Sequence, residues 1–234
     1  MTTVLFVRHG LTDANTSGVL AGWTPGVHLS DKGREQVDAL AERLAPLTPN
    51  AVLTSPLERC HETADVLAKG RDTLSPVVDE RFGECKYGDW TGQELKKLVK
   101  EPLWRVVQAH PSAARFPGDG GESLAETQAR AVAGVREWND KLGADATYLV
   151  VSHADVIKAI LADALGQHLD SFQRIVVNPA SLSVVQYTDL RPFVMRVNDT
   201  GGRVDDIMPP KKRTRRRKPS SDAVVGGGTG QPTA

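Results

Sequence analysis

The chain has 234 residues, of which 40% are hydrophobic and 25% are charged, and its formal net charge is zero. A chain of this length can bury a sizeable core without disulfides or metals, and its composition excludes collagen-like, coiled-coil and wholly disordered classes. No apolar run approaches the roughly 18 residues of a membrane-spanning helix, and the run 4–7 is too short for a signal peptide. Two cysteines do not make a secreted disulfide framework, so we expect a cytoplasmic protein.

The zero net charge hides an uneven distribution of charge along the chain. Seven of the 29 Lys and Arg residues lie between Lys211 and Lys218, and Asp222 is the only acidic residue after position 207. Residues 1–207 therefore hold 22 basic and 28 acidic residues, a charge of about −6. The remainder combines the basic run with Gly, Pro and Ser, a composition typical of disorder. We expect one domain over 1–207 and a disordered tail over 208–234.

The first predicted elements are two strands, each followed by a helix. Residues 3–8 (TVLFVR) form a short apolar run of the kind that is buried on both faces of a sheet. After a polar loop, Ser30 is a good N-cap for a helix whose apolar residues repeat at helical spacing. Residues 51–54 (AVLT) predict the second strand, and Ser55 followed by Pro56 predicts the start of the next helix.

The middle of the chain alternates loops and helices around one weak strand. The run 76–79 predicts a third strand, and the glycine-punctuated segment 83–92 (GECKYGDWTG) predicts a loop. A helical stretch follows over about 93–110 and is broken near Pro102. After a second glycine-rich loop, Ser123 predicts the cap of a long helix.

The last part of the domain predicts one more strand–helix unit and then a pair of strands. The run 147–151 (TYLVV) predicts the fourth strand, and a helix follows it to about Gly166. Residues 181–187 and 193–197 predict two final strands. Strands that alternate with helices favour an α/β fold whose central sheet is mostly parallel and is flanked by helices on both faces.

Charged and histidine side chains follow three of these predicted strands. The first strand ends at Arg8 and His9, the second leads to Arg59, and the fourth ends at His153. Because ligands bind beyond the carboxyl ends of parallel strands, we expect these side chains to meet at one edge of the sheet. Arginine suits phosphate oxygens, a neutral histidine can attack phosphorus, and a cationic second histidine can stabilise the transition state.

Motifs along nearly the whole predicted domain carry a resemblance to a known family. In chain order they read RHGLTDAN at 8–15, GW at 22–23, LSDKGREQ at 29–36, SPLERCHETA at 55–64, GECKYGDWTG at 83–92, GGES at 120–123 and VSH at 151–153. Together they resemble the histidine phosphatase superfamily, in its phosphoglycerate-mutase-like branch. The resemblance implies a mostly parallel sheet with an antiparallel edge strand, which the two last predicted strands could supply.

The resemblance also assigns roles to residues. It implies a histidine acid-type phosphatase that needs no metal or cofactor and hydrolyses phosphomonoesters through a phosphohistidine on His9. Glu84 matches the family's proton donor, and Asp89 and Glu80 stay as alternatives. The residues assigned to phosphate and substrate binding are Arg8, Asn15, Gly22, Arg59 and His153.

One position departs from the family pattern. The residue after the second histidine is commonly Gly in this family, and here it is Ala154, followed by Asp155. A carboxylate near an anion pocket can repel phosphate or help select the rest of the substrate. The two cysteines, Cys60 and Cys85, follow proposed catalytic residues, and we expect inert thiols that point away from the pocket, with a redox switch as the alternative.

Three other functions are alternatives to hydrolysis. A mutase would return the phosphoryl group to a bound acceptor, but the segment 93–119 lacks the long basic insertion of the family's mutases. A phospho-ligand module without catalysis would lack the nucleophile or the acid, and neither is missing. Binding of nucleic acid through the basic tail would be non-specific. We therefore expect a small phosphomonoester as substrate, no membrane and no specific nucleic acid, with a homodimer as an open hypothesis.

Overall fold

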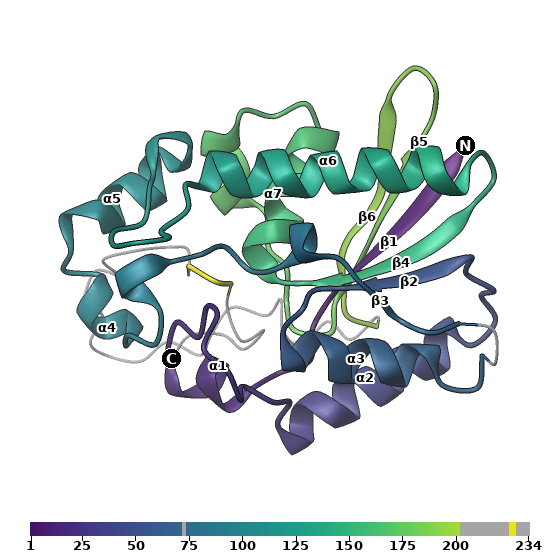
Figure 1. Ribbon diagram of the computed structural model, residues 1–234, viewed down its shortest axis with the longest axis horizontal. Helices are drawn as coiled ribbons and strands as arrows, with labels where there is room; N and C mark the ends of the chain where they lie inside the picture. The colour runs from purple at the N-terminus through teal and green to yellow at the C-terminus, as the bar shows by residue number, and fades with distance from the viewer. Residues whose placement is uncertain (72–73, 202–224, 228–234) are drawn as a thin grey trace, which may run out of the picture.

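The computed structural model describes residues 1–71, 74–201 and 225–227 (Figure 1). The disordered tail expected from 208 onward lies outside the described residues except for Val225–Gly227. Those three residues contact the domain, which the sequence does not anticipate. Among the described residues, no helix is both long and apolar enough to cross a membrane.

The core of the fold is a six-stranded sheet in the order β3-β2-β4-β1-β5-β6. The strands β1, β2, β3 and β4 are mutually parallel, and β5 runs antiparallel to both of its neighbours. The expected mostly parallel sheet is confirmed, with the antiparallel strand one place in from the edge. The strands are β1 (Thr2–Arg8), β2 (Ala51–Thr54), β3 (Val77–Val78), β4 (Thr147–Ser152), β5 (Leu182–Tyr187) and β6 (Pro192–Asp199).

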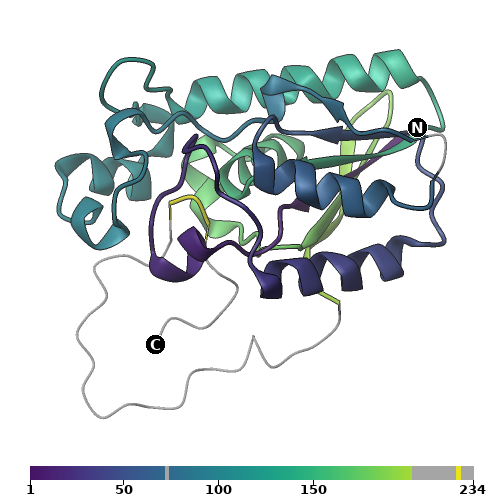
Figure 2. The ribbon, with the colours of Figure 1, turned by 60° about the horizontal axis from the view of Figure 1, so that its bottom comes forward.

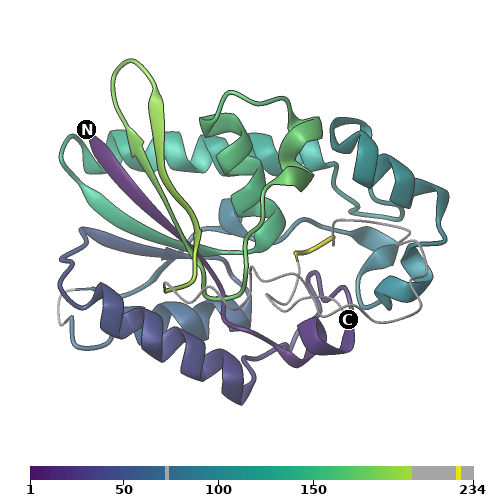
Figure 3. The same cartoon turned by 180° about the vertical axis from the view of Figure 1, so that it is seen from behind.

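Helices cover both faces of the sheet (Figure 1, Figure 3). On one face lie α2 (Asp31–Leu44) and α3 (Glu58–Ala68), and on the other lie α6 (Leu124–Leu142) and α7 (Ala154–Ala164). Successive residues of β1 point to opposite faces, so Leu5 packs in the core under α2 and α3 while Phe6 packs in the core under α6 and α7. The residues of both cores are buried around the strands that carry the site.

Helix starts follow the capping rules at two places and depart from them at a third. Ser30 and Ser123 cap α2 and α6 through their hydroxyl oxygens, as the sequence predicts. The cap predicted at Ser55 is wrong, because α3 begins at Glu58 and its N-cap is Leu57. The Ser55 hydroxyl has a different partner, which is described below.

Short elements extend from the end of the sheet where β1 and β4 finish (Figure 2). The predicted break at Pro102 is confirmed, since Pro102 begins a helix of its own. The short helices are α1 (Asp13–Ser17), α4 (Leu95–Leu98) and α5 (Pro102–Ala109), with 3-10 turns at Glu80–Phe82, Gly88–Trp90, Pro111–Ala113 and Leu169–Arg174. These elements form the walls around the sheet edge at which the predicted site residues lie.

Candidate active site

The two histidines lie side by side where neighbouring strands end. Arg8 of β1 is in register with Ser152 of β4, and the backbone N–H of His9 donates to the carbonyl of Ser152 at 3.0 Å. The rings of His9 and His153 are 5.2 Å apart between centroids and inclined by 61°. The parallel pairing of β1 with β4 therefore produces the juxtaposition that the strand ends predict.

The hydrogen bonds around His9 fix which of its ring nitrogens carries the proton. Nδ1 lies 2.8 Å from the carbonyl oxygen of Gly10, which can only accept, so Nδ1 donates. The Nε of Arg59 donates to Nε2 at 3.3 Å, so Nε2 holds the lone pair. Burial first, and then Arg59 and Arg8, lower the pKa of His9 well below its ordinary value. His9 is thus a neutral imidazole with a basic Nε2 inside the site.

His153 has the opposite arrangement of proton and lone pair. Nη2 of Arg59 donates to Nδ1 at 3.2 Å, so Nε2 carries the hydrogen and donates to the Ser55 hydroxyl at 2.7 Å. Burial, followed by Arg59, lowers the pKa of His153 well below its ordinary value. The cationic second histidine expected from the sequence is therefore not the form that these surroundings favour, because the ring is buried beside two arginines.

Arg59 is the side chain that joins the parts of the site. It is 2% exposed, and its guanidinium contacts His9, His153 and the carbonyl of Gly22, the last at 2.9 Å. Gly22 has a φ of 52°, and a Cβ there would lie 2.9 Å from the Thr91 hydroxyl, so this close approach favours glycine. Among the described residues, Nη1 of Arg59 is buried without a hydrogen-bond partner. A ligand oxygen would satisfy that donor.

Arg8 supplies the second fixed positive charge. Its Nη1 donates to the carbonyl of Val177 at 2.8 Å, and its Nη2 donates to the carbonyl of Gly226 at 3.3 Å. Burial lowers the pKa of Arg8 to about 10, so the guanidinium stays charged at neutral pH. Two charged arginines beside two neutral histidines make a site that favours an anion.

Glu84 is the carboxylate next to the histidines. It is 4% exposed, its Oε2 lies 3.8 Å from Nδ1 of His153, and its Oε1 accepts from the backbone N–H of Cys85 at 2.9 Å. Burial, and then the nearby Asp155, raise the pKa of Glu84 to about 7. The alternatives Asp89 and Glu80 are both exposed, so Glu84 is the carboxyl group suited to hold a proton at neutral pH.

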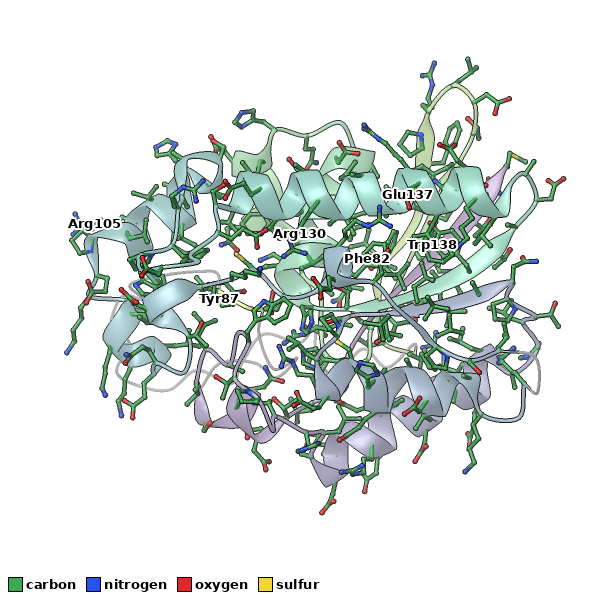
Figure 4. All side chains as sticks on the ribbon, viewed as in Figure 1. Phe82, Tyr87, Arg105, Arg130, Glu137 and Trp138 are labelled. Atoms are coloured by element: carbon green, nitrogen blue, oxygen red, sulfur yellow. The ribbon has the colours of Figure 1, made fainter. Side chains whose placement is uncertain are left out.

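The loop that carries Glu84 is held by side chains that the sequence does not point out. Trp23 Nε1 donates to the carbonyl of Glu84 at 2.7 Å, and Nη2 of Arg130 donates to the same carbonyl at 3.0 Å. Arg130 projects from α6 toward the segment that carries Phe82, and Glu122 accepts from it at 2.6 Å (Figure 4). No local motif identifies Arg130, because its partners are distant in the chain.

Asn15 lies at the rim of the site, within α1. Its Oδ1 accepts from the backbone N–H and from the hydroxyl of Thr12, at 3.1 and 2.9 Å, and so completes a capping box. The oxygen end of the amide is therefore used locally. The Nδ2 end is the part of Asn15 able to donate to a ligand.

The two cysteine thiols are buried, but they do not both point away from the site. The Sγ of Cys60 lies 3.4 Å from Nε2 of His153, so its predicted orientation is wrong. Cys60 follows Arg59 by one residue on α3 but packs inward beside β4. Burial raises the pKa of Cys60 to about 12 and that of Cys85 well above its ordinary value, which favours unreactive thiols.

Comparison with known proteins places this geometry in a family. The model of the histidine phosphatase superfamily (branch 1) matches residues 4–200. Phosphoserine phosphatase 1 of Hydrogenobacter thermophilus is 30% identical over 203 residues, which cover 86% of this chain and 93% of that protein. Glucosyl-3-phosphoglycerate phosphatase of Mycolicibacterium vanbaalenii is 33% identical over 178 residues, which cover 72% and 76%.

Solved structures share the fold. A mycobacterial glucosyl-3-phosphoglycerate phosphatase in complex with VO3 superposes with a TM-score of 0.75 at 27% identity, covering 84% of this chain and 98% of that one. Phosphoserine phosphatase from Entamoeba histolytica, in complex with 3-phosphoglyceric acid, has a TM-score of 0.77 at 20% identity, covering 85% and 98%. The chain therefore belongs to the histidine phosphatase superfamily, branch 1, and is a phosphomonoester hydrolase of that family.

Proposed function

We propose that the chain hydrolyses small phosphomonoesters through a covalent phosphohistidine on His9. The single observation that carries this proposal is the orientation of His9. Its Nε2 holds a lone pair and lies beside Arg59, whose buried Nη1 has no partner in the part of the chain that the structure describes. A phosphoryl oxygen bound to that guanidinium would hold phosphorus close to the nucleophilic nitrogen.

In the first step Nε2 of His9 attacks phosphorus. The P–N bond forms, the ester P–O bond breaks, and the leaving oxygen takes a proton from Glu84. The carbonyl of Gly10 stabilises the positive charge that develops on the ring, because it accepts from Nδ1. Glu84 is protonated up to a pH of about 7, so it can serve as this acid under neutral conditions.

In the second step water attacks the phosphohistidine. The Glu84 carboxylate takes the proton from water, a new P–O bond forms and the P–N bond breaks, so inorganic phosphate leaves and His9 is neutral again. Arg8 and the buried Nη1 of Arg59 offer donors to the equatorial oxygens in both steps. The negative charge of the bound phosphoryl group favours a second proton on His153, at Nδ1, and His153 then donates as well. We expect these charges to suffice without a metal ion.

Charge around the loops favours water over a second hydroxyl as the acceptor. A mutase must clamp the other anionic group of its substrate with free basic side chains. Lys96 and Lys97 are exposed and pair with Glu94, and Arg115 pairs with Glu126. These bases therefore do not form a closed clamp, which supports hydrolysis rather than isomerisation.

The relatives support a small phosphorylated metabolite as substrate, since their names specify phosphoserine and glucosyl-3-phosphoglycerate. The absence of a specific nucleic-acid partner, the homodimer and the cytoplasmic location stay predictions of the sequence. Asn15 and Gly22 complete the proposed binding set. The carbonyl of Gly22 positions Arg59, and Asn15 offers its amide nitrogen to the substrate.

A panel of phosphorylated metabolites, with p-nitrophenyl phosphate as the general probe, tests the proposal. We expect release of inorganic phosphate from several esters, no loss of rate with EDTA, and inhibition by vanadate. Interconversion of 2- and 3-phosphoglycerate should be negligible beside hydrolysis. Isomerisation faster than phosphate release, or a rate that EDTA abolishes, would contradict it.

A further inference from the structure

Residues Val225–Gly227 lie inside the site rather than apart from the domain. Val225 is 1% exposed and packs in the larger core. The segment, drawn in yellow, lies beside the start of α7 and the loop that follows α1 (Figure 2, Figure 3). It therefore occupies the space that adjoins Arg8.

Gly226 bridges a cation and an anion with its own backbone. Its carbonyl accepts from Nη2 of Arg8 at 3.3 Å, and its N–H donates to Oδ2 of Asp155 at 2.9 Å. The backbone of Gly226 thus presents an acceptor to Arg8 and a donor to the carboxylate of Asp155. A substrate with a phosphoryl oxygen and a nearby donor would offer the same pair of groups.

Glycines permit this close approach. Gly226 and Gly227 have φ angles of 76° and 77°, in the left-handed region that favours glycine. A Cβ on Gly227 would lie 2.3 Å from the Cβ of Ala154 and 2.8 Å from Nη1 of Arg8. The backbone therefore reaches Arg8 and Asp155 at a distance that no side chain would allow.

Asp155 is held in place by the domain itself. It is fully buried, Tyr87 donates its hydroxyl to Oδ2 at 2.9 Å, and Lys158 donates Nζ to Oδ1 at 3.2 Å. Both of these donors belong to packed side chains that also hold the carboxylate in one orientation. The N–H of Gly226 is the donor that an incoming molecule can replace.

We propose that Asp155 is a specificity-determining residue, which selects phosphomonoesters whose leaving group carries a hydrogen-bond donor, an ammonium best of all. Arg8 then binds a phosphoryl oxygen, and the donor of the leaving group replaces the N–H of Gly226. This inference rests on the proposed phosphatase function. Lys158 pairs with Oδ1 of Asp155 and compensates part of its charge. Oδ2, which faces Gly226, still attracts a cationic group and disfavours an anionic one, because little water screens it.

Three esters of similar size separate these effects. Phosphoethanolamine carries an ammonium, ethyl phosphate carries no second polar group, and phosphoglycolate carries a carboxylate. In the unaltered full-length protein we expect kcat/KM to fall in that order, with about tenfold or more between the first and the second, the scale of a charged hydrogen bond. The difference should appear mainly in KM.

Asp155→Asn is the matched variant, since it keeps the shape and removes the charge. We expect the ratio of kcat/KM between phosphoethanolamine and ethyl phosphate to fall to near one. Both esters have an alkyl leaving group, so a change in the acidity of Glu84 affects their rates in the same direction, and the ratio responds mainly to the charge of Asp155. If the variant does not fold, equal rates for phosphoethanolamine and ethyl phosphate, or a preference for phosphoglycolate, in the unaltered protein still overturn the inference.

The outcomes distinguish failure of the role proposed for Asp155 from failure of the proposed phosphatase function. Equal rates for phosphoethanolamine and ethyl phosphate, a preference for phosphoglycolate, or an unchanged ratio in Asp155→Asn would overturn the role of Asp155 while phosphate release continues. Failure to hydrolyse any ester, p-nitrophenyl phosphate included, would instead overturn the phosphatase function and this inference with it.

Discussion

The site has two halves that are built from different parts of the chain. The phosphate half lies at the ends of adjacent parallel strands, and its charged side chains are fixed by backbone carbonyls and by each other. The leaving-group half is assembled from a loop, the first turn of α7 and a segment near the C-terminus. The phosphate half comprises Arg8, His9, Arg59 and His153, and the leaving-group half comprises Glu84, Tyr87, Asp155 and Gly226.

The phosphate half carries out the chemistry, and the leaving-group half determines which ester is used. The phosphate half follows from strand pairing and from the position of α3 after β2, which together bring these charged and histidine side chains to one edge of the sheet. The leaving-group half depends on contacts such as Gly226 with Asp155, which lie 71 residues apart. Changes in the first half should therefore abolish turnover, and changes in the second should alter which ester is used.

The largest effect should come from removing the nucleophile. His9→Ala should lower kcat by at least about a thousandfold, because no other group in the site replaces Nε2. Phosphate release from p-nitrophenyl phosphate measures this. The exposed His110 supplies a control, since His110→Ala should keep the full rate; substantial turnover by His9→Ala would place the nucleophile elsewhere.

A smaller loss, dependent on the ester, should follow a change in Glu84. Glu84→Gln should slow hydrolysis of an alkyl phosphate by roughly 10²- to 10⁴-fold and of p-nitrophenyl phosphate much less, because a good leaving group needs no acid. In the unaltered enzyme kcat/KM should fall as the pH rises above about 7, where Glu84 loses its proton. Equal losses for both esters would move the role to Asp89 or Glu80, whose amide variants are the controls.

The raised pKa of Glu84 also has a consequence for stability. A carboxyl group whose pKa is higher in the folded state contributes stability below its unfolded pKa and loses it as the pH rises through about 7. The free energy of unfolding of Glu84→Gln, taken relative to that of the unaltered protein, should therefore be higher at pH 8.5 than at pH 5 by roughly 2 kcal/mol. Denaturant unfolding at the two pH values measures it, and an equal difference at both would show that the carboxyl group is not buried as described.

The smallest effect should come from the C-terminal segment. Because Gly226 contacts Arg8 and Asp155, removal of the chain from Val225 onward should lower KM by roughly three- to tenfold, the scale of a displaced hydrogen bond. Removal of residues 228–234 alone is the control. Gly227→Ala should act in the same direction as the longer truncation. An unchanged KM in the protein truncated from Val225 and in Gly227→Ala would mean that substrate binds without displacing residues 225–227.

Much of the fold and of the phosphate half could be predicted from the sequence, because both depend on local patterns. The apolar runs fix the strands, Ser30 and Ser123 satisfy helix N–H groups directly, and the residues after the strands meet because parallel strands end at one edge. Ser55 shows why some expectations around this half were wrong. The Ser55 hydroxyl can either cap a helix or accept a hydrogen bond from His153. Only the paired strands bring His153 within reach, so the sequence does not show which of the two forms.

The leaving-group half was less predictable, for a physical reason. Asp155 could be noted as a carboxylate near the anion pocket, but its partners Tyr87 and Gly226 reach it only after the loop and the C-terminal segment have packed. A Gly-rich tail next to a basic run has the composition of a disordered segment. Its glycines gave no signal of a binding role, because the close approach at Gly227 is visible only in three dimensions.

Rapid chemical quenching during turnover of a phosphomonoester, followed by mass spectrometry of the digested protein, tests the central claim most directly. We expect a phosphoryl group that is acid-labile and base-stable, carried by the peptide that contains His9, and absent from His9→Ala. Glu84→Gln should accumulate more of it if attack of water on the intermediate is slowed more than its formation. A phosphoryl group trapped on any other residue, or no covalent intermediate under conditions where phosphate is released, would contradict the account.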